Sequence, residues 1–254
     1  MKAFRFWVVA VMMVAAIGCA HHQGTGLQSG TTTTQTLLGP AEAEPVEPVP
    51  PTFAVTPDPL YGLNVAMFEL NDRLYFWLLK PLATGYRAVF PEPVRTGVRN
   101  FFYNLTAPIR IVSCLFQAKG PQFGSELIRF LMNSTVGVLG FGNPAAKYPD
   151  LTPPEEDLGQ TLGSYGIGNG FYIVWPFLGP STLRDSVGRF GQTFLNPVSY
   201  VEPWHSYIGI RALDLTNDLS FRIGDYESLK EAALDPYEAL KDGYLQRRAA
   251  QIKE

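Results

Sequence analysis

The sequence is poor in charged residues, which make up 17 % of its 254 positions, against about 25 % in ordinary soluble domains. Lysine and arginine together number 20 and aspartate and glutamate 23, so the net charge is −3. A chain without a basic excess lacks the positive surface that binds a phosphate backbone. We therefore expect no nucleic acid among its partners.

Cysteine and histidine are also scarce, with two and three residues respectively. So few thiol and imidazole groups leave little from which to build a disulfide framework, a zinc site or a histidine-based catalyst. We expect no metal and no cofactor. Cys114 lies in an apolar helical pattern, which indicates a small buried core residue without redox function.

The chain is instead rich in apolar residues, at 46 %, and in aromatic residues, at 13 %. This composition excludes a disordered protein and allows a sizeable core. Together with the low charge, it indicates that part of the surface contacts something apolar.

The first twenty residues have the pattern of a secretory signal. Lys2 and Arg5 precede an apolar run over residues 6–16, which is followed by small residues. The run is shorter than the roughly 20 residues that span a membrane as a helix. Residues 16–19, Ala-Ile-Gly-Cys, resemble a bacterial lipobox, so we expect cleavage before Cys19 and acylation of its thiol. An ordinary signal peptide with an incidental cysteine is the alternative.

An acylated Cys19 predicts stable membrane attachment, because two or three acyl chains hold a protein on a bilayer where one does so only marginally. Ala20 stands where an aspartate would, by resemblance to enterobacterial sorting, favour the inner membrane. We therefore expect the outer membrane. Removal of residues 1–18 takes away Lys2 and Arg5 and changes the net charge from −3 to −5.

The segment after the signal has the composition of a linker. Residues 20–57 contain a run of four threonines and six prolines but no lysine or arginine. Their apolar content is too low to offset the entropy of ordering, and proline-rich chain is extended at about 3.1 Å per residue. We expect three parts: a signal peptide over 1–18, the lipidated cysteine and a disordered linker over 19–57, and a folded domain over 58–254.

Helical periodicity dominates residues 58–254, and period-two alternation is scarce. Asp58 and Pro59 form a cap signal before apolar residues spaced by three and four positions up to Trp77, and Lys80-Pro81 is expected to end or kink this helix. Further helical patterns occur around 94–105, 109–116 and 123–130, after Thr182, over 207–226, and after Asp235-Pro236. The expected fold is predominantly α.

Residues 158–183 contain no charged side chain, yet they hold too many glycines and prolines for a plain transmembrane helix. A buried connection between helices, a membrane-dipping hairpin and a gate are all compatible with this composition. In a gate, the glycines supply backbone freedom and the aromatic rings supply bulk that can close a pore. The channel or gate candidates are Gly159, Gly163, Tyr165, Gly166, Gly168, Gly170, Phe171 and Tyr172, with Asn71 on the first helix, whose amide either bonds a loop carbonyl or faces solvent.

No catalytic motif is present. Ser164 lacks the context of a nucleophile elbow, and His205, the only histidine of the folded domain, has no partner by motif and is interpreted as exposed. Residues 166–170 lack the lysine and the third glycine of nucleotide-binding loops. We interpret as solvated surface or helix ends the carboxylates at 155–157, 231 and 235 and the pair Arg247-Arg248. The residues favour a lipid-anchored helical binding or transport protein over an enzyme.

Short motifs follow one another along the whole folded domain. They are Asp58-Pro59-Leu60-x-Gly62-x-Asn64, Asn71-Asp72, Lys80-Pro81, Tyr86-Arg87, Pro91-x-Pro93-Val94-Arg95, Asn100-Phe101-Phe102-x-Asn104-Leu105, Arg129-Phe130-x-x-Asn133-Ser134-Thr135-x-Gly137, Glu156-Asp157-x-Gly159-Gln160-Thr161-Leu162-Gly163, Gly179-Pro180-Ser181-Thr182-Leu183-Arg184-Asp185, Asp235-Pro236-Tyr237 and Tyr244-Leu245-Gln246-Arg247-Arg248. In this order they resemble the MlaA (VacJ) family of outer-membrane lipoproteins. Tyr61, Leu63 and Phe171 depart from the usual residues, which are glutamate, phenylalanine and proline.

The resemblance implies a ring of mainly α-helices in the inner, periplasmic leaflet of the outer membrane, with a central amphipathic channel. Mislocalised phospholipids of the outer leaflet would pass through the channel to a soluble periplasmic carrier, MlaC, and return to the inner membrane, which maintains lipid asymmetry. It also implies trimeric porins of the OmpC/OmpF kind as partners. A structural envelope lipoprotein without transport activity is the alternative, and a lipid-modifying enzyme is disfavoured because no nucleophile and base are evident.

Overall fold

The computed structural model describes residues 56–253, which belong to one compact unit, Pro51–Glu254. The predicted signal peptide, Cys19 and nearly all of the predicted linker lie outside the described residues. Thr56 and Pro57 already contact the folded unit, because Asn169 donates a hydrogen bond to Thr56 at 3.3 Å and the Tyr172 amide donates to the Pro57 carbonyl at 3.0 Å. The folded unit therefore begins by Thr56, slightly before the predicted boundary at Asp58.

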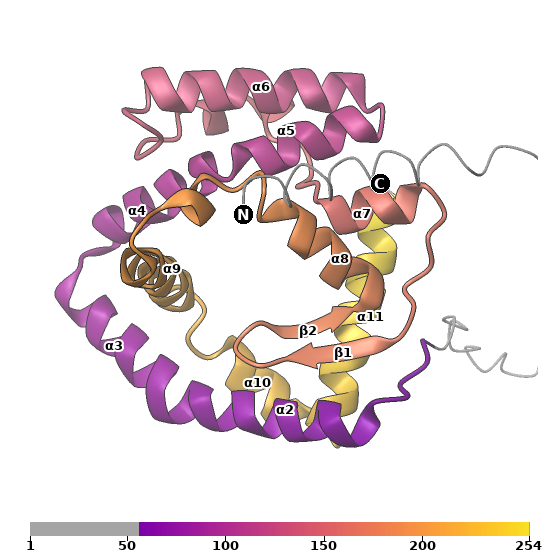
Figure 1. Ribbon diagram of the computed structural model, residues 1–254. Helices are drawn as coiled ribbons and strands as arrows, with labels where there is room; N and C mark the ends of the chain where they lie inside the picture. Colours follow the sequence, from indigo (N-terminus) through magenta and orange to yellow (C-terminus); the bar gives the residue numbers. More distant parts are fainter. Residues whose placement is uncertain (1–55, 254) are drawn as a thin grey trace, which may run out of the picture. The chain divides into compact units, whose positions relative to one another are not determined.

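The fold is predominantly α, as expected, with one small antiparallel sheet (Figure 1). The α-helices are α2 (Tyr61–Leu74), α3 (Lys80–Val89), α4 (Glu92–Leu105), α5 (Ala107–Phe116), α6 (Gly120–Thr135), α7 (Leu158–Ser164), α8 (Leu183–Gln192), α9 (Trp204–Leu219), α10 (Asp225–Ala232) and α11 (Pro236–Lys253). A π-helical turn (Tyr75–Leu79) joins α2 to α3, and 3₁₀ turns cover Pro144–Lys147, Pro149–Leu151 and Pro197–Tyr200. Strands β1 (Tyr172–Trp175) and β2 (Gly179–Thr182) form a hairpin in which Tyr172 pairs with Thr182.

Within this unit the helices follow one another around a circuit (Figure 1). Helices α2 and α3 form one side, α4 and α5 form the opposite side, and α7, α11 and the hairpin lie between their far ends. Helix α9 packs against both α3 and α4, and α6 lies along the outside of α5. This arrangement fits the ring that the family resemblance implies. No helix within residues 56–253 is long and apolar enough to cross a membrane.

The first helix differs from the prediction at both ends. It begins at Tyr61 rather than at Pro59, and helical structure continues through Lys80-Pro81 to Val89. Of the two predicted outcomes at Lys80-Pro81, an end of the helix is wrong, whereas the change of direction between α2 and α3 in Figure 1 agrees with a kink. Proline has no amide proton to donate, and the π-helical turn before it changes the bonding, since the Lys80 amide donates to the Tyr75 carbonyl five residues earlier.

Most other helices lie where periodicity and cap signals place them. Thr182 caps α8 by accepting a 3.2 Å hydrogen bond from the Asp185 amide, and Asp235 accepts a 2.9 Å bond from the Tyr237 amide at the start of α11. The helix predicted over 207–226 is wrong in its second half, because α9 ends at Leu219 and α10 begins after Gly224. Gly224 has a φ of +106°, a left-handed conformation that glycine adopts without strain.

Cys114 is fully buried on α5, as predicted, with 0 % of its surface exposed. Burial, with the nearby charges of Glu156 and Glu126, raises the pKa of the Cys114 thiol to about 11. We expect iodoacetamide at pH 8 to leave the Cys114 peptide unlabelled in the folded protein and to label it after denaturation, as measured by peptide mass spectrometry. Because Cys114→Ala should cost on the order of 1 kcal/mol, this variant should still fold. Rapid labelling of folded protein would contradict the burial.

Candidate functional site

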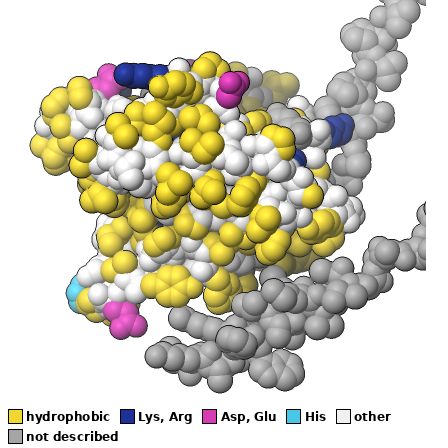
Figure 2. Space-filling model, turned by 90° about the horizontal axis from the view of Figure 1, so that it is seen from above, with side chains coloured by type: hydrophobic (Ala, Val, Ile, Leu, Met, Phe, Trp, Pro, Cys, Tyr) yellow, Lys and Arg dark blue, Asp and Glu magenta, His cyan; other side chains and the backbone are white. Residues whose placement is uncertain are grey.

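Large apolar side chains gather on the outside of the unit. Trp77 is 81 % exposed and Trp204 is 72 % exposed, and α6 exposes Leu127, Ile128 and Leu131. Figure 2, which looks down on the side where α6 lies, shows hydrophobic side chains over the middle of the face and charged groups near its upper and lower margins. Soluble monomers rarely carry so extensive an apolar surface, and its transfer from water to hydrocarbon is favourable. The exterior therefore suits an apolar medium.

The interior is correspondingly polar. Among residues 56–253, the buried polar and charged side chains outnumber the buried apolar ones. The small apolar core combines Tyr172, Val174 and Tyr237 with partly buried neighbours. The buried charged side chains are Arg95, Arg110, Glu126, Glu156, Arg184, Asp185 and Arg248. In most soluble proteins the buried side chains are mainly apolar, and a charged side chain is buried only when it is paired. Here polar and charged side chains make up most of the buried set.

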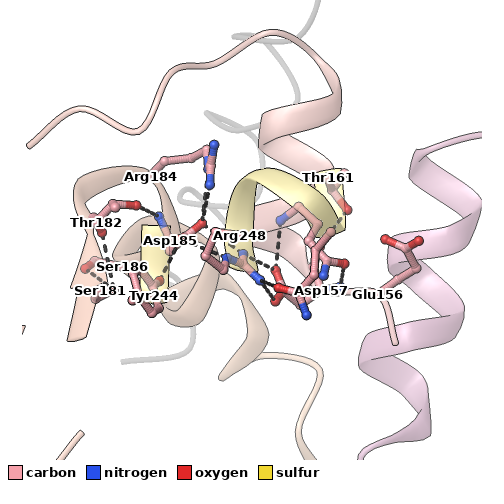
Figure 3. Close-up of polar contacts among 12 residues, drawn as sticks. Glu156, Asp157, Thr161, Ser181, Thr182, Arg184, Asp185, Ser186, Tyr244 and Arg248 are labelled. Atoms are coloured by element: carbon pink, nitrogen blue, oxygen red, sulfur yellow. Dashed lines mark hydrogen bonds and ion pairs between the residues drawn. The ribbon is translucent and has the colours of Figure 1, made fainter. Parts of the chain in front are cut away.

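Three helices meet at a set of paired charges, which we name the Arg248 network: Asp157, Arg184, Asp185, Tyr244 and Arg248 (Figure 3). The Arg248 guanidinium, on α11, contacts Asp185 at 2.9 Å and Asp157 at 2.7 Å. Asp185 also accepts hydrogen bonds from Tyr244 at 2.7 Å and from Arg184 at 3.0 Å. The network therefore ties α11 to α8 and to the start of α7.

Local sequence prepares this network. Asp157 is the N-cap of α7 and forms a reciprocal capping box with Gln160, which fixes the direction of its carboxylate. Gly159 provides the space, because a Cβ there would lie 2.6 Å from Asp185 Oδ1 and 2.7 Å from an Arg248 nitrogen. A Cβ at Gly188 would lie 2.4 Å from the Gly159 amide nitrogen. The two glycines thus let α7 and α8 approach backbone to backbone.

The charges of the network reinforce one another. Burial opposes ionisation of Asp185, but hydrogen bonding and charge from Arg248, with Tyr244 and Arg184, outweigh it and lower the pKa of this carboxyl. Burial likewise disfavours the Arg248 cation, while Asp157 and Asp185 raise its pKa. Asp185 and Arg248 are therefore both charged at neutral pH and form a stable ion pair.

A pocket of about 370 Å³ opens beside this network. It lies between α5, α7, α8, α11 and the segment before α7. Its lining residues are Thr106, Ile109, Arg110, Glu155, Glu156, Asp157, Gln160, Asp185, Arg189, Gln192, Tyr244, Arg247, Arg248 and Gln251. Among residues 56–253, no three histidine, cysteine or carboxylate side chains cluster so as to hold a metal ion.

Two asparagines of α2 hold the hairpin. The fully buried Asn64 donates to the Tyr172 carbonyl at 3.0 Å and accepts from the Val174 amide at 2.8 Å. Asn71 repeats the pattern, donating to the Trp175 carbonyl at 2.9 Å and accepting from the Phe177 amide at 2.8 Å. Of the two alternatives for Asn71, contact with the backbone of the uncharged segment is therefore confirmed. The two amides satisfy the edge of β1 that β2 does not cover.

The structure divides the predicted gate segment into three parts. Gly159 and Gly163 lie in α7, where Gly163 packs against Ile252. Tyr172 begins β1 and is fully buried in the core. Between them runs the loop 165–171, which holds Tyr165, Gly166, Gly168, Gly170 and Phe171; Gly166 and Gly170 have positive φ angles of +82° and +69°. Tyr165 is exposed, and its hydroxyl donates to the Phe116 carbonyl of α5.

Comparison with known proteins places the chain in a family. The family model of the MlaA lipoprotein matches residues 56–251. The chain belongs to the MlaA family. It is 33 % identical over 193 residues to the intermembrane phospholipid transport system lipoprotein MlaA of Escherichia coli K12, with 75 % of this chain and 76 % of the relative aligned. The MlaA lipoprotein of Haemophilus influenzae is 26 % identical over 211 residues, covering 78 % of this chain and 80 % of the relative.

A solved structure agrees with this family membership. It is described as "Structural basis for maintenance of bacterial outer membrane lipid asymmetry", and it superposes with a TM-score of 0.69 at 31 % sequence identity. The match covers 77 % of this chain and 99 % of the chain in the solved structure. The helical fold described above is thus shared with an experimentally solved relative.

The sequence does not predict the burial of several polar residues of the site. For Glu156 the sequence predicts solvated surface or a helix end. Glu156 does precede the N-cap of α7, but solvated surface is wrong, because the side chain is buried and contacts Lys119 at 2.5 Å. Arg248 was expected at a solvated helix end and is instead buried, whereas Arg247 beside it is exposed, as predicted. His205 is exposed, as predicted. The signal that could have marked Asp157, Asp185 and Arg248 is their place in three separate family motifs, since spacing alone does not connect them.

Proposed function

We propose that this protein is a lipid-anchored component of the outer membrane that takes mislocalised phospholipids from the outer leaflet and passes them on for return to the inner membrane, maintaining lipid asymmetry. The apolar exterior around a polar, charge-paired interior carries the proposal. Such a body lies in hydrocarbon with little cost, and a polar interior lets a headgroup cross without losing all of its polar partners. The names of the MlaA relatives support the same activity.

The finer parts of this proposal concern location and partners. The body lies in the periplasmic leaflet, anchored through Cys19, and its central amphipathic channel conducts the lipid. Trimeric porins of the OmpC/OmpF kind flank the exposed apolar exterior, and the carrier MlaC receives lipid on the periplasmic side. These partners follow from the family resemblance, and the absence of a basic excess in the sequence keeps nucleic acid out of the proposal.

The decisive experiment measures surface-exposed phospholipid in a deletion strain with and without the gene restored. Loss of the protein should raise outer-leaflet phospholipid, and restoration should reverse the rise. Normal outer-leaflet composition in the deletion strain would favour the structural envelope lipoprotein instead. Turnover of phospholipid by the purified protein would favour a lipid-modifying enzyme.

Cys19→Ala should abolish incorporation of labelled palmitate, because the lipidated thiol is lost. Acyl labelling is a cleaner measurement than fractionation, since the apolar body itself can sediment with membranes. The matched control is Cys114→Ala, which removes the other cysteine of the chain and should label normally. Palmitate incorporation into Cys19→Ala would contradict the predicted anchor.

The segment 158–174 is proposed to control the channel together with the first helix, and the loop 165–171 is its part without regular secondary structure. In a Cys114→Ala background, Tyr165→Cys and Phe116→Cys can be joined by a reducible bismaleimide, because Tyr165 contacts the Phe116 carbonyl. The tether should raise surface phospholipid, and reduction should restore the barrier. Wild-type asymmetry in fully cross-linked protein, at this and other tether positions, would make the segment a static connection.

A further inference from the structure

The pocket beside the Arg248 network has the size of a site for a lipid headgroup. Its volume of about 370 Å³ lies at the lower end of the range of roughly 300–1,000 Å³ that small-molecule pockets occupy. A whole phospholipid with two acyl chains needs more room. The exposed apolar side chains outside the pocket, in contrast, can contact acyl chains.

The arginines of the pocket fall into two pairs. Arg248 is fully bonded by the network, and Arg110 donates to Glu126 at 3.0 Å, to Thr106 and to the Tyr103 carbonyl. The guanidinium groups of Arg189 and Arg247 have no hydrogen bond or ion pair with any other group in the described part of the chain. The Nη1 atom of Arg189 is nevertheless fully buried.

A buried guanidinium nitrogen without an acceptor is unfavourable, and arginine cannot relieve this cost by losing its charge. Arg189 therefore favours an anionic partner that enters the pocket. A phosphate group is the best match, because its oxygens fit the planar fork of guanidinium donors and two arginines can share them.

The acidic residues of the pocket narrow the choice of headgroup. The lining contains four carboxylates, of Glu155, Glu156, Asp157 and Asp185, against four guanidinium groups. Glu156, Asp157 and Asp185 are paired with cations, whereas Glu155 is exposed and has no partner within residues 56–253. A lining with two unpaired cations and one unpaired anion suits a ligand that carries both a phosphate and an ammonium group.

We infer that this pocket binds the phosphoethanolamine headgroup of a phospholipid, with the phosphate on Arg189 and Arg247 and the ammonium at Glu155. The inference rests on the proposed function, which brings phospholipid to the protein. It assigns a headgroup preference and a site of contact, which the transport activity alone does not require. Free phosphate shares the anionic chemistry, so the test includes it separately.

The test uses the full lipoprotein in detergent micelles and measures binding by calorimetry. The probes are dihexanoyl phosphatidylethanolamine, dihexanoyl phosphatidylglycerol and inorganic phosphate. Arg189→Gln should weaken binding of both lipids about tenfold or more, as expected for loss of charge-assisted hydrogen bonds. Glu155→Gln should weaken only phosphatidylethanolamine and so remove the preference for it. Arg222→Gln, which changes an exposed arginine paired with Asp218 outside the pocket, should bind as wild type.

Three results would overturn the inference. One is wild-type affinity in Arg189→Gln; another is a preference for phosphatidylethanolamine that survives Glu155→Gln; the third is inorganic phosphate binding as tightly as the lipid. Arg189→Lys keeps the charge without the fork and should bind with intermediate affinity, which separates loss of the site from loss of the fold. If the pocket binds as expected while the deletion strain keeps normal asymmetry, the proposed function fails and the headgroup site stands.

Discussion

Arg248→Ala is expected to be strongly destabilised and to unfold well below the melting temperature of the wild type. The substitution leaves the Asp185 carboxylate buried without its main cation. It also removes the ion pairs that join α11 to Asp185 of α8 at 2.9 Å and to Asp157 at the start of α7 at 2.7 Å. Breaking a buried ion pair from one side costs about 3–5 kcal/mol, a large share of the roughly 5–15 kcal/mol that stabilises a domain. Thermal unfolding of the purified lipoprotein in detergent, followed by circular dichroism, measures the effect.

The matched control is an arginine whose ion pair is exposed. Arg73 lies 3.7 Å from Glu69, and their side chains are 68 % and 61 % exposed. Because exposed pairs contribute about 0–1 kcal/mol, Arg73→Ala should melt close to wild type. Equal melting temperatures of the two variants would contradict a large contribution of the Arg248 network to stability. The lowered pKa of Asp185 makes the free energy of unfolding depend on pH. The stabilisation from the ionised Asp185 carboxylate is fully present above about pH 4 and is lost as the pH falls further.

Gly188→Ala is the second variant with a large expected effect. The added methyl would lie 2.4 Å from the Gly159 amide nitrogen and 2.7 Å from the Gly159 Cα. These are backbone atoms of α7, which cannot relieve the clash by changing rotamer as a side chain can. Helix α7 must shift away from α8, which also moves the Asp157 cap out of the Arg248 network. We expect a loss at or above the top of the usual overpacking range of about 1–3 kcal/mol.

Gly209→Ala in α9 is the control for the same chemical change. No described atom outside the helix backbone lies within 4 Å of a Cβ at this position. The alanine should therefore stabilise the helix by about 0.5–1 kcal/mol through its better propensity. The two substitutions should change the melting temperature in opposite directions. A neutral or stabilising Gly188→Ala would contradict the close contact of α7 and α8.

The sequence predicts the helices well because their signals are local. Cap residues such as Thr182 and Asp235 act within a few positions, and apolar spacing is read within one turn. Pro81 is misleading because the π-helical turn before it, formed by residues further back, changes which amide each carbonyl binds. The break between α9 and α10 depends on Gly224 and on packing that periodicity does not contain.

Periodicity also identifies an apolar helix face without telling which way the face points. Leu63, Leu70 and Trp77 belong to the regular apolar face of the first helix and are exposed, whereas Met67 of the same face packs against the small apolar core. Polar residues between them make the contacts with the rest of the unit, since Asn64 and Asn71 donate hydrogen bonds to the hairpin backbone. A protein surrounded by water would bury more of this apolar face.

The polar site could not be predicted because its contacts are distant in sequence and directional. Asp157, Asp185 and Arg248 come from three helices, and no spacing rule connects them. Glu156 and Lys119 meet in the same way, across the interval from α5 to α7. The tertiary fold decides which charged side chains are buried, so a side chain that the sequence assigns to solvated surface can instead hold the structure together.

The reversed distribution of polarity also decides which substitutions the protein can tolerate. In water-soluble proteins the surface accepts most changes and the interior accepts apolar exchanges of similar volume. Here the outward positions should accept any apolar residue but few charges. The interior should reject even exchanges that keep shape, such as Asp185→Asn or Asn64→Leu, because each removes an acceptor or donor that a buried partner needs. A saturation mutagenesis profile of this chain should therefore look inverted, with its strictest positions polar and its most permissive ones apolar.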